Sequence, residues 1–185
     1  MILIFGAPSG SGKSTLVNYL LGKRNDLEFS VSATTRAPRG QEVNGKEYYF
    51  ISNQEFEQLI KDDKLVEWQQ VYSGTYYGTL RSEIDRIEAK GHHVVFDVDV
   101  KGGANLKHLF GDKALSIFVA PPSVEELRKR LIHRATDSAD KIEERLNKAA
   151  EELTYRDKFD VVIVNDSLQD AEQQLDSVVN KFLEQ

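Results

Sequence analysis

"MILIFGAPSGSGKST" (residues 1–15) joins a short apolar segment to a loop of glycine and serine. The apolar run at 1–5 predicts a strand buried on both faces, because apolar and polar residues do not alternate along it. The pattern "LVNYLLGK" comes next and predicts a helix over 14–22. A glycine-rich loop between a strand and a helix can wrap its backbone N–H groups around phosphate oxygens. This stretch therefore predicts a site for a nucleoside triphosphate.

The individual residues of the loop have distinct expected roles. Gly10 and Gly12 allow the tight path of the backbone, Lys13 can reach the β- and γ-phosphates, and Ser14 can hold Mg²⁺. The match to the Walker A pattern fails by one residue, because Ala7 stands where the pattern has glycine. The alternative is a turn that only connects a strand to a helix.

The rest of the chain repeats the alternation of strand and helix. Further apolar runs at 93–98, 115–120 and 161–164 predict buried strands, and each ends on polar or loop-forming residues. Helices are expected at 79–90, 100–110, 139–156 and 168–183, and Ser52 with Glu55 and Ser123 with Glu126 fit the capping-box pattern. The pattern predicts an α/β fold, with a parallel sheet of the P-loop NTPase type flanked by helices.

The segment 33–78 differs from the rest in texture. It is rich in glycine, arginine and tyrosine and contains short alternating runs such as "LVEWQQVY". We expect an inserted, mostly β lobe with one helix. The 185 residues suffice for one core with such appendages, but not for two independent domains of ordinary size.

The overall composition narrows the class of protein. The net charge is −6, so no general attraction for nucleic acid is expected. The chain contains no cysteine, which fits a reducing compartment. No apolar window approaches the ~20 residues of a membrane-spanning helix, and the apolar start is too short for a signal peptide. The expected location is the cytoplasm, with no membrane partner.

A second group of basic and phenolic residues suggests a phosphate-bearing acceptor. Arg36 and Arg39 stand three residues apart behind a run of serine and threonine, and Tyr48 and Tyr77 can add hydroxyl donors. Guanidinium groups suit a bidentate grip on phosphate. The alternative is that the two arginines belong to a solvated surface.

Taken in order, six segments resemble the guanylate kinase family over nearly the whole chain: "APSGSGKST", "SATTRAPRGQEVNGKEYYF", "VEWQQVYSGTYYGT", "VVFDVDVKGG", "APPSVEELRKRL" and "VIVND". The resemblance implies a Mg²⁺-dependent enzyme of purine metabolism that transfers the γ-phosphoryl group of ATP to GMP. It also implies one domain over 1–185, with a core at 1–32, 79–125 and 146–185, a GMP-binding lobe at 33–78 and a lid at 126–145. Acceptance of dGMP and the oligomeric state stay open.

The resemblance assigns roles to individual residues. Expected GMP-binding residues are Ser32, Arg36, Arg39, Tyr48, Glu67, Tyr77, Thr79, Asp97 and Asp99. Expected ATP-binding residues are Ala7, Pro8, Ser9, Gly10, Ser11, Gly12, Lys13, Ser14, Thr15 and Asn165. Expected catalytic residues are Lys13, Arg130, Arg134 and Arg145. Ser14 is expected to bind Mg²⁺, with Asp97 in the outer coordination shell of the ion.

Two departures from the family pattern concern the acceptor lobe. The family usually has glycine directly before the glutamate at 42, whereas this chain reads Gly40-Gln41-Glu42. Thr79 stands where serine is common, which keeps the hydroxyl group.

Three other functions compete with the kinase: a domain of this fold that only binds proteins, a phosphotransferase with another acceptor, and a simple nucleotide triphosphatase. The last would leave Arg36 and Arg39 without a purpose.

Overall fold

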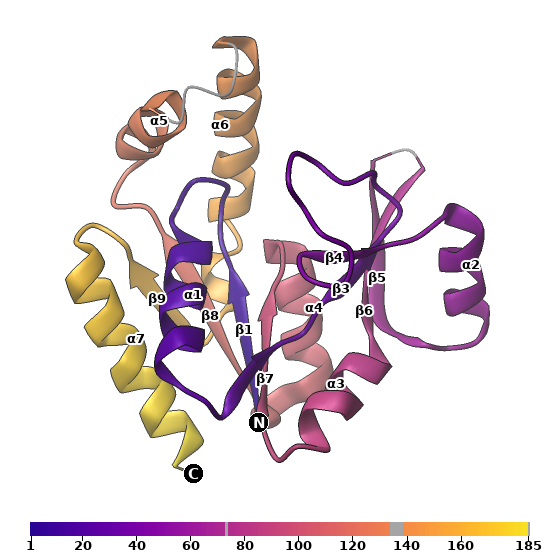
Figure 1. Ribbon diagram of the computed structural model, residues 1–185. Helices are drawn as coiled ribbons and strands as arrows, with labels where there is room; N and C mark the ends of the chain where they lie inside the picture. The colour runs from indigo at the N-terminus through magenta and orange to yellow at the C-terminus, as the bar shows by residue number, and fades with distance from the viewer. Residues whose placement is uncertain (73, 134–138, 185) are drawn as a thin grey trace. The chain divides into compact units, whose positions relative to one another are not determined.

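A computed structural model describes residues 1–72, 74–133 and 139–184 of the chain (Figure 1). The chain divides into two compact units, the first formed by residues 1–25 and 97–185 and the second by residues 26–96. The expected lobe at 33–78 lies within the second unit.

The first unit contains three parallel strands. They are β1 (Ile2–Gly6), β8 (Ala114–Ala120) and β9 (Val161–Val164), with β8 between the other two. Every residue of β1 and β8 is buried, which explains why neither strand alternates apolar with polar residues. The expected parallel strands are thus confirmed.

Helices of the first unit follow these strands. They are α1 (Lys13–Lys23), α4 (Val100–Phe110), α5 (Val124–His133), α6 (Ala139–Leu153) and α7 (Leu168–Leu183). Helix α1 packs on β1 and α7, whereas α4 packs on β1 and β8 (Figure 1). Two short 3₁₀ helices span Gly111–Lys113 and Arg156–Lys158. Leu127, Leu131, Leu146 and Ala149 form a core of their own between α5 and α6.

The second unit is mostly β structure, as expected. Its sheet has the order β4-β3-β6-β5, and its strands are β3 (Ser32–Thr34), β4 (Tyr48–Phe50), β5 (Leu65–Tyr72) and β6 (Thr75–Leu80). Strands β3 and β4 are parallel, and the other two pairs are antiparallel. Helices α2 (Asn53–Lys61) and α3 (Arg81–Glu88) belong to this unit, and β2 (Leu27–Phe29) pairs with β7 (His93–Asp97).

The boundaries differ from expectation in several places. Strand β2 was not predicted from the sequence. The helix predicted from residue 79 begins at Arg81, because Thr79 and Leu80 pair with Glu67 and Leu65 in the sheet. The helix predicted to reach 156 ends at Leu153. These errors fall where pairing with a distant strand, or a turn, overrides the local helical pattern.

Both predicted helix starts carry a side-chain cap. Ser52 accepts a hydrogen bond from the backbone N–H of Glu55, and the Glu55 carboxylate accepts one from the backbone of Ser52, which completes a capping box. Ser123 accepts from the backbone N–H of Glu126 at 3.0 Å. Within the described residues, no helix is long and apolar enough to cross a membrane.

Candidate functional site

The loop between β1 and α1 has a shape that only glycine allows at two positions. Gly10 and Gly12 both have a φ of 92°, in the left-handed region. A Cβ atom added at Gly12 would lie 2.1 Å from Nδ2 of Asn165. At Gly10 it would lie 3.0 Å from Cδ1 of Leu127. The predicted ATP-binding residues from Ala7 to Thr15 all lie in this loop and the first turn of α1.

The start of α1 provides backbone donors toward an anion. Gly12 is the N-cap residue and makes no side-chain cap hydrogen bond, so no cap side chain satisfies the first amides of the helix. The loop is closed behind them by the Ser11 hydroxyl, which donates to the carbonyl of Pro8 at 2.6 Å. Amides at a helix N-terminus favour phosphate through hydrogen bonds and the helix dipole.

Lys13 and Ser14 point toward the end of β7. The Lys13 ammonium lies 2.5 Å from Oδ1 of Asp97 and also donates to the carbonyl of Val98. The Ser14 hydroxyl donates to Oδ2 of Asp97 at 3.4 Å. The structure therefore brings together residues that are far apart in the sequence. Ser14 contacts Asp97, 83 positions away, and Lys13 contacts Val98, 85 positions away. One cation, one hydroxyl and one carboxylate meet at the phosphate loop.

The same three groups fit a bound Mg²⁺ with its substrate. Magnesium is usually held by one or two protein oxygens together with phosphate oxygens and waters, not by a cage of protein ligands. A Ser14 hydroxyl beside an Asp97 carboxylate matches that requirement. No cluster of three or more histidine or acidic side chains that could hold a metal occurs within the described residues.

Asp99, two residues further on, forms the N-cap of α4. Its Oδ1 accepts a hydrogen bond from the backbone N–H of Gly102 at 2.7 Å. This hydrogen bond caps the start of α4 and stabilises it. The role of Asp99 in GMP binding stays a prediction.

Arg130 and Asn165 link α5 to the phosphate loop. Nη2 of Arg130 donates to the backbone carbonyl of Asn165 at 3.0 Å, and the Asn165 side chain donates to the carbonyl of Ser11 at 2.9 Å. Asn165 is buried. Asn165 therefore contacts the phosphate loop, and its contact with ATP stays a prediction. Arg145 lies on α6, and Arg134 lies outside the described residues.

Glu152 on α6 was not identified from the sequence. Its side chain is buried, and Nζ of Lys148 lies 3.9 Å from its Oε1. Burial raises the pKa of Glu152, an effect that Lys148 and the Ser9 N–H only partly offset. The sequence around Glu152 did not indicate that its side chain is buried, because the burial arises from the packing of α6.

Arg36, in the second unit, is held by several partners at once. Nη1 and Nη2 donate to the two carboxylate oxygens of Glu42 at 2.7 and 2.9 Å, and Nε donates to the Tyr77 hydroxyl at 3.1 Å. The guanidinium carbon lies 5.2 Å from the ring centroid of Tyr48 and 5.5 Å from that of Phe50. Hydrogen bonds in its plane and rings across its face together fix its orientation.

Glu42 is the functional candidate that sequence reasoning missed. Besides Arg36, it accepts a hydrogen bond from the backbone N–H of Arg39 at 2.7 Å. The Arg36 guanidinium lowers the pKa of Glu42 from its ordinary value of 4.5 to about 2, and the Arg39 N–H assists. The signal was present in the sequence, because an acid three residues after Arg39 can close a turn onto both arginines. The Arg39 side chain itself is exposed.

Glu67 and Thr79 form a direct pair across β5 and β6. They are opposite each other in the strand register, and the Thr79 hydroxyl donates to Oε1 of Glu67 at 2.9 Å. Thr79 is fully buried. The departure from serine therefore leaves the hydroxyl in use. Ser32 on β3 stands opposite Tyr48 on β4 in the register of that pair.

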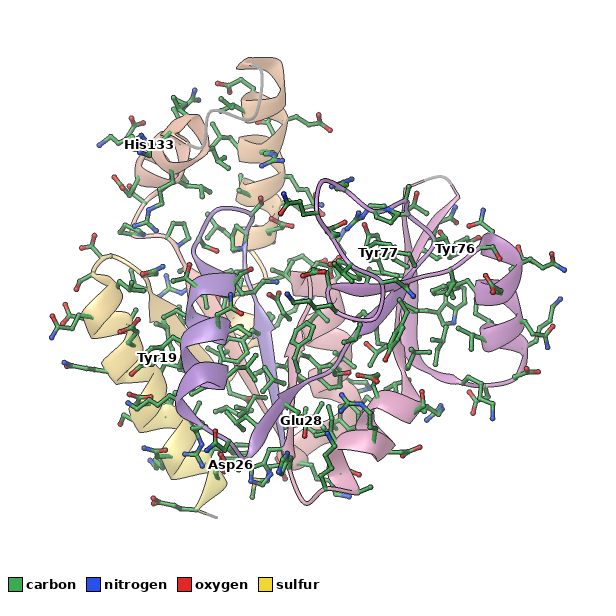
Figure 2. The ribbon with its side chains drawn as sticks, in the orientation of Figure 1. Tyr19, Asp26, Glu28, Tyr76, Tyr77 and His133 are labelled. Carbon is green, nitrogen blue, oxygen red and sulfur yellow. The ribbon has the colours of Figure 1, made fainter. Side chains whose placement is uncertain are left out.

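The alternation of side chains along β6 places the arginine grip around Arg36 and the Glu67–Thr79 pair on one face of the sheet. Tyr76 and Tyr77 are neighbours on β6 (Figure 2). Tyr76 packs with the rings of Phe56 and Trp68, whereas Tyr77 packs with the ring of Tyr48. Successive strand residues point to opposite faces, so Tyr77 and Thr79 share a face. The arginine grip and the Glu67–Thr79 pair therefore open to the same side.

Comparisons with known proteins agree on one family. A family model described as guanylate kinase matches residues 1–182. The guanylate kinase of Bacteroides fragilis is 50% identical over 182 residues, which cover 98% of this chain and 89% of that protein. That of Porphyromonas gingivalis is 48% identical, covering 98% and 97%. The crystal structure of guanylate kinase from Anaplasma phagocytophilum matches with a TM-score of 0.78 and 31% identity, covering 98% of this chain and 85% of the other.

Proposed function

This chain belongs to the guanylate kinase family, and we propose that it transfers the γ-phosphoryl group of ATP to GMP, giving ADP and GDP. The phosphate loop of the first unit takes ATP in this proposal, and the sheet of the second unit takes GMP. The absence of cysteine fits a reducing compartment such as the cytoplasm.

One observation carries the choice of acceptor. A phosphate grip and a candidate reader for a base lie on the same face of β6. The grip consists of Arg36 with the Tyr77 hydroxyl, and the reader is the pair of half-buried Glu67 and buried Thr79. An acceptor that has both a phosphate and a base can engage the two groups together. An acceptor without a base would leave this pair unused.

The chemistry of Glu67 favours guanine over adenine. Guanine presents an N1–H and an exocyclic amine side by side, and a carboxylate can accept from both donors. Adenine has only an acceptor at N1, which would face the carboxylate without a hydrogen bond. A buried polar group left unpaired by the wrong substrate can support discrimination of about 10⁴-fold.

On the donor side, the residues of the phosphate loop bind and orient ATP. The backbone N–H groups at the start of α1 donate hydrogen bonds to the phosphates, and Lys13 supplies positive charge toward the β- and γ-phosphates. Ser14 and Asp97 are placed to hold Mg²⁺, which would neutralise charge on the phosphate oxygens when bound. Asp97 also keeps the Lys13 side chain on this side of the loop.

The reaction needs no catalytic base. The second pKa of a phosphate monoester is near ~6, so the GMP phosphate is mostly dianionic at neutral pH. One of its oxygens attacks the γ-phosphorus, the bond from that phosphorus to the bridging oxygen breaks, and ADP leaves with the electron pair. The protein positions the two anions and compensates their charge through Lys13, Arg130 and Arg145. Closure of α5 and α6 over ATP would exclude water from the transfer.

The test is ADP release from Mg-ATP with GMP, AMP, UMP, dTMP or ribose 1,5-bisphosphate as the acceptor. Wild type should turn over on GMP and not on the other four. Glu67→Gln keeps the shape of the side chain but puts a donor opposite the guanine donors. We expect it to lower kcat/KM for GMP by on the order of 10³-fold.

Glu57→Gln is the matched control, since Glu57 is an exposed glutamate on α2 of the same unit. It should retain the kcat/KM of wild type for GMP. Turnover on another acceptor would replace GMP by that acceptor. ADP release without any acceptor would indicate a triphosphatase, and ATP binding without turnover would indicate a domain that only binds other molecules.

A further inference from the structure

Glu83 is a buried carboxylate outside the residues assigned to either substrate. It lies in the first turn of α3 and is 4% exposed. Its Oε2 accepts from the backbone N–H of Val31 at 3.0 Å, and its Oε1 accepts from the Tyr49 hydroxyl at 3.0 Å. Arg86 donates to both oxygens, from Nε at 3.1 Å and from Nη2 at 3.0 Å.

The protonation state of Glu83 follows from these contacts. Burial alone would raise the pKa of its carboxyl group, but Arg86, the Val31 N–H and the Tyr49 hydroxyl outweigh burial, and the pKa is lowered. The carboxylate is therefore charged at neutral pH. A buried charge is costly unless it is paired and hydrogen-bonded, and Glu83 meets both conditions.

The neighbours of Glu83 frame two of the residues expected to bind GMP. Val31 directly precedes Ser32, and Tyr49 directly follows Tyr48. Ser32 and Tyr48 are opposite each other in the register of β3 and β4. The Glu83 carboxylate thus links Val31, next to Ser32, with Tyr49, next to Tyr48.

The pairing between β3 and β4 is short, whereas β3 is also held by antiparallel pairing with β6. Strands β3 and β4 each have only three residues, and parallel pairing is slightly less stable per residue than antiparallel pairing. The chain between them, 35–47, contains Arg36 of the phosphate grip and Arg39. A small shift of either strand would therefore move Ser32, Tyr48 and the ends of this loop.

Arg86 has a second acidic partner, Glu28, with which the role of Glu83 can be compared. Nη1 of Arg86 donates to Oε2 of Glu28 at 2.6 Å, and Lys90 and His92 also contact Glu28. Glu28 is on β2, well away from Tyr77 on β6 (Figure 2). Within the part of the chain that the structure describes, Glu28 hydrogen-bonds to Arg86, Lys90 and His92 and not to Val31 or Tyr49. Glu28 thus shares the charge cluster of Glu83 without its contacts to β3 and β4.

We propose that Glu83 is a positioning residue for GMP binding, whose carboxylate holds β3 and β4 in the register that presents Ser32 and Tyr48 to the nucleotide. The inference rests on the proposed function for its substrate. The effect of Glu83 is on the acceptor, not on the ATP loop of the first unit. A residue that only stabilised the fold would affect both substrates.

The test compares Glu83→Gln with Tyr49→Phe and with the matched control Glu28→Gln. In Glu83→Gln we expect the KM for GMP to rise on the order of tenfold, while the Kd for ATP, measured without GMP, stays within about twofold of wild type. Tyr49→Phe removes one of the four hydrogen bonds to Glu83 and should give a smaller rise in the same KM. Glu28→Gln should leave the KM for GMP as in wild type.

Hydrogen exchange provides a readout that does not depend on turnover. Amides of residues 31–34 and 48–50 should exchange faster in Glu83→Gln than in wild type, whereas those of β8 should not change. A Glu28→Gln variant with the same KM and exchange as Glu83→Gln would overturn the inference, as would an equal loss of ATP affinity. If Glu83→Gln does not fold, Tyr49→Phe carries the test, and an unchanged KM and unchanged exchange there would overturn it.

The failure of this inference is distinguishable from a failure of the proposed function. Wild type without GMP turnover would refute the proposed function. The exchange experiment would then still decide whether Glu83 holds β3 and β4. Wild type with GMP turnover, together with unchanged exchange in Glu83→Gln, would refute the positioning role alone.

Discussion

The two units of this molecule are built to hold phosphate in different ways. In the first unit the site is a backbone shape, because Gly10 and Gly12 adopt a φ of 92° against Leu127 and Asn165. In the second unit the site is a charged side chain, Arg36, whose direction is fixed by Glu42 and aromatic rings. The loop of the first unit should therefore be most sensitive to added side-chain volume at these glycines. The site of the second unit should depend on the direction of the Arg36 guanidinium as well as on its charge.

The largest expected effect is that of Gly12→Ala on ATP binding. The added methyl group would lie 2.1 Å from Nδ2 of Asn165, and alanine is strained at a φ of 92°. Strain at such a position costs ~1–3 kcal/mol, and the overlap with Asn165 adds to it, so the ATP affinity should fall by on the order of 10³-fold. Equilibrium titration with ATP measures this loss.

Gly22→Ala is the matched control for that substitution. Gly22 is on α1 and a Cβ atom there would meet nothing within 4 Å. Alanine is favoured over glycine in a helix by roughly 0.5–1 kcal/mol, so this variant should be slightly more stable and bind ATP as wild type does. Equal loss of ATP affinity in both variants would refute the role of loop shape.

The next effect is that of Arg36→Lys on GMP. Lysine keeps the positive charge but cannot form the two parallel hydrogen bonds to Glu42 or stack its plane on Tyr48. The kcat/KM for GMP should fall by on the order of 10²-fold through misplacement of the phosphate. Steady-state kinetics at saturating ATP measure it. Arg81→Lys, at an exposed arginine of α3, should behave as wild type.

A smaller effect is expected from Glu42→Gln, and it depends on pH. The pKa of Glu42 is lowered from 4.5 to about 2 in the folded state, so its ion pair stabilises the fold above pH 4.5. That contribution is lost as the pH falls through about 2. At pH 7 the variant should melt about 1–3 °C below wild type. Thermal melts between pH 7 and pH 2 should show this gap closing, and a constant gap would contradict the assignment.

The smallest effect is that of Glu152→Gln, with the opposite sign. The pKa of Glu152 is raised by burial, so the folded protein binds this proton more tightly than the unfolded chain does. Its charged form therefore destabilises the fold above the ordinary pKa of 4.5. The glutamine variant should melt about 1–2 °C above wild type at pH 7. A melt at pH 4 should show a smaller difference, and a lower melting temperature at pH 7 would be inconsistent with this view.

Much of the architecture was predictable because its signals are local. The buried strands appear as uninterrupted apolar runs, and the Ser52 cap depends on residues three positions apart. The phosphate loop could be identified for the same reason, since Gly10, Gly12 and Lys13 are close together in the sequence. Local patterns of this kind survive in almost any tertiary setting.

The supporting carboxylates could not be predicted, because their partners are chosen by tertiary packing. Glu83 bonds to Val31, which is 52 positions away, and Glu152 is buried only through the packing of α6. The contacts of Glu42 were easier to predict, since its partners Arg36 and Arg39 are on the same loop. The sequence therefore indicates which residues contact the substrates more readily than which residues hold those contacts in place.

Binding of ATP and of GMP to wild type, Gly12→Ala and Arg36→Lys by calorimetry tests the division between the two units most directly. The account predicts a crossed result, in which Gly12→Ala loses affinity for ATP and keeps its affinity for GMP, while Arg36→Lys does the reverse. If either variant lost both ligands equally, or if Gly12→Ala lost only GMP, the assignment of one phosphate site to each unit would be contradicted.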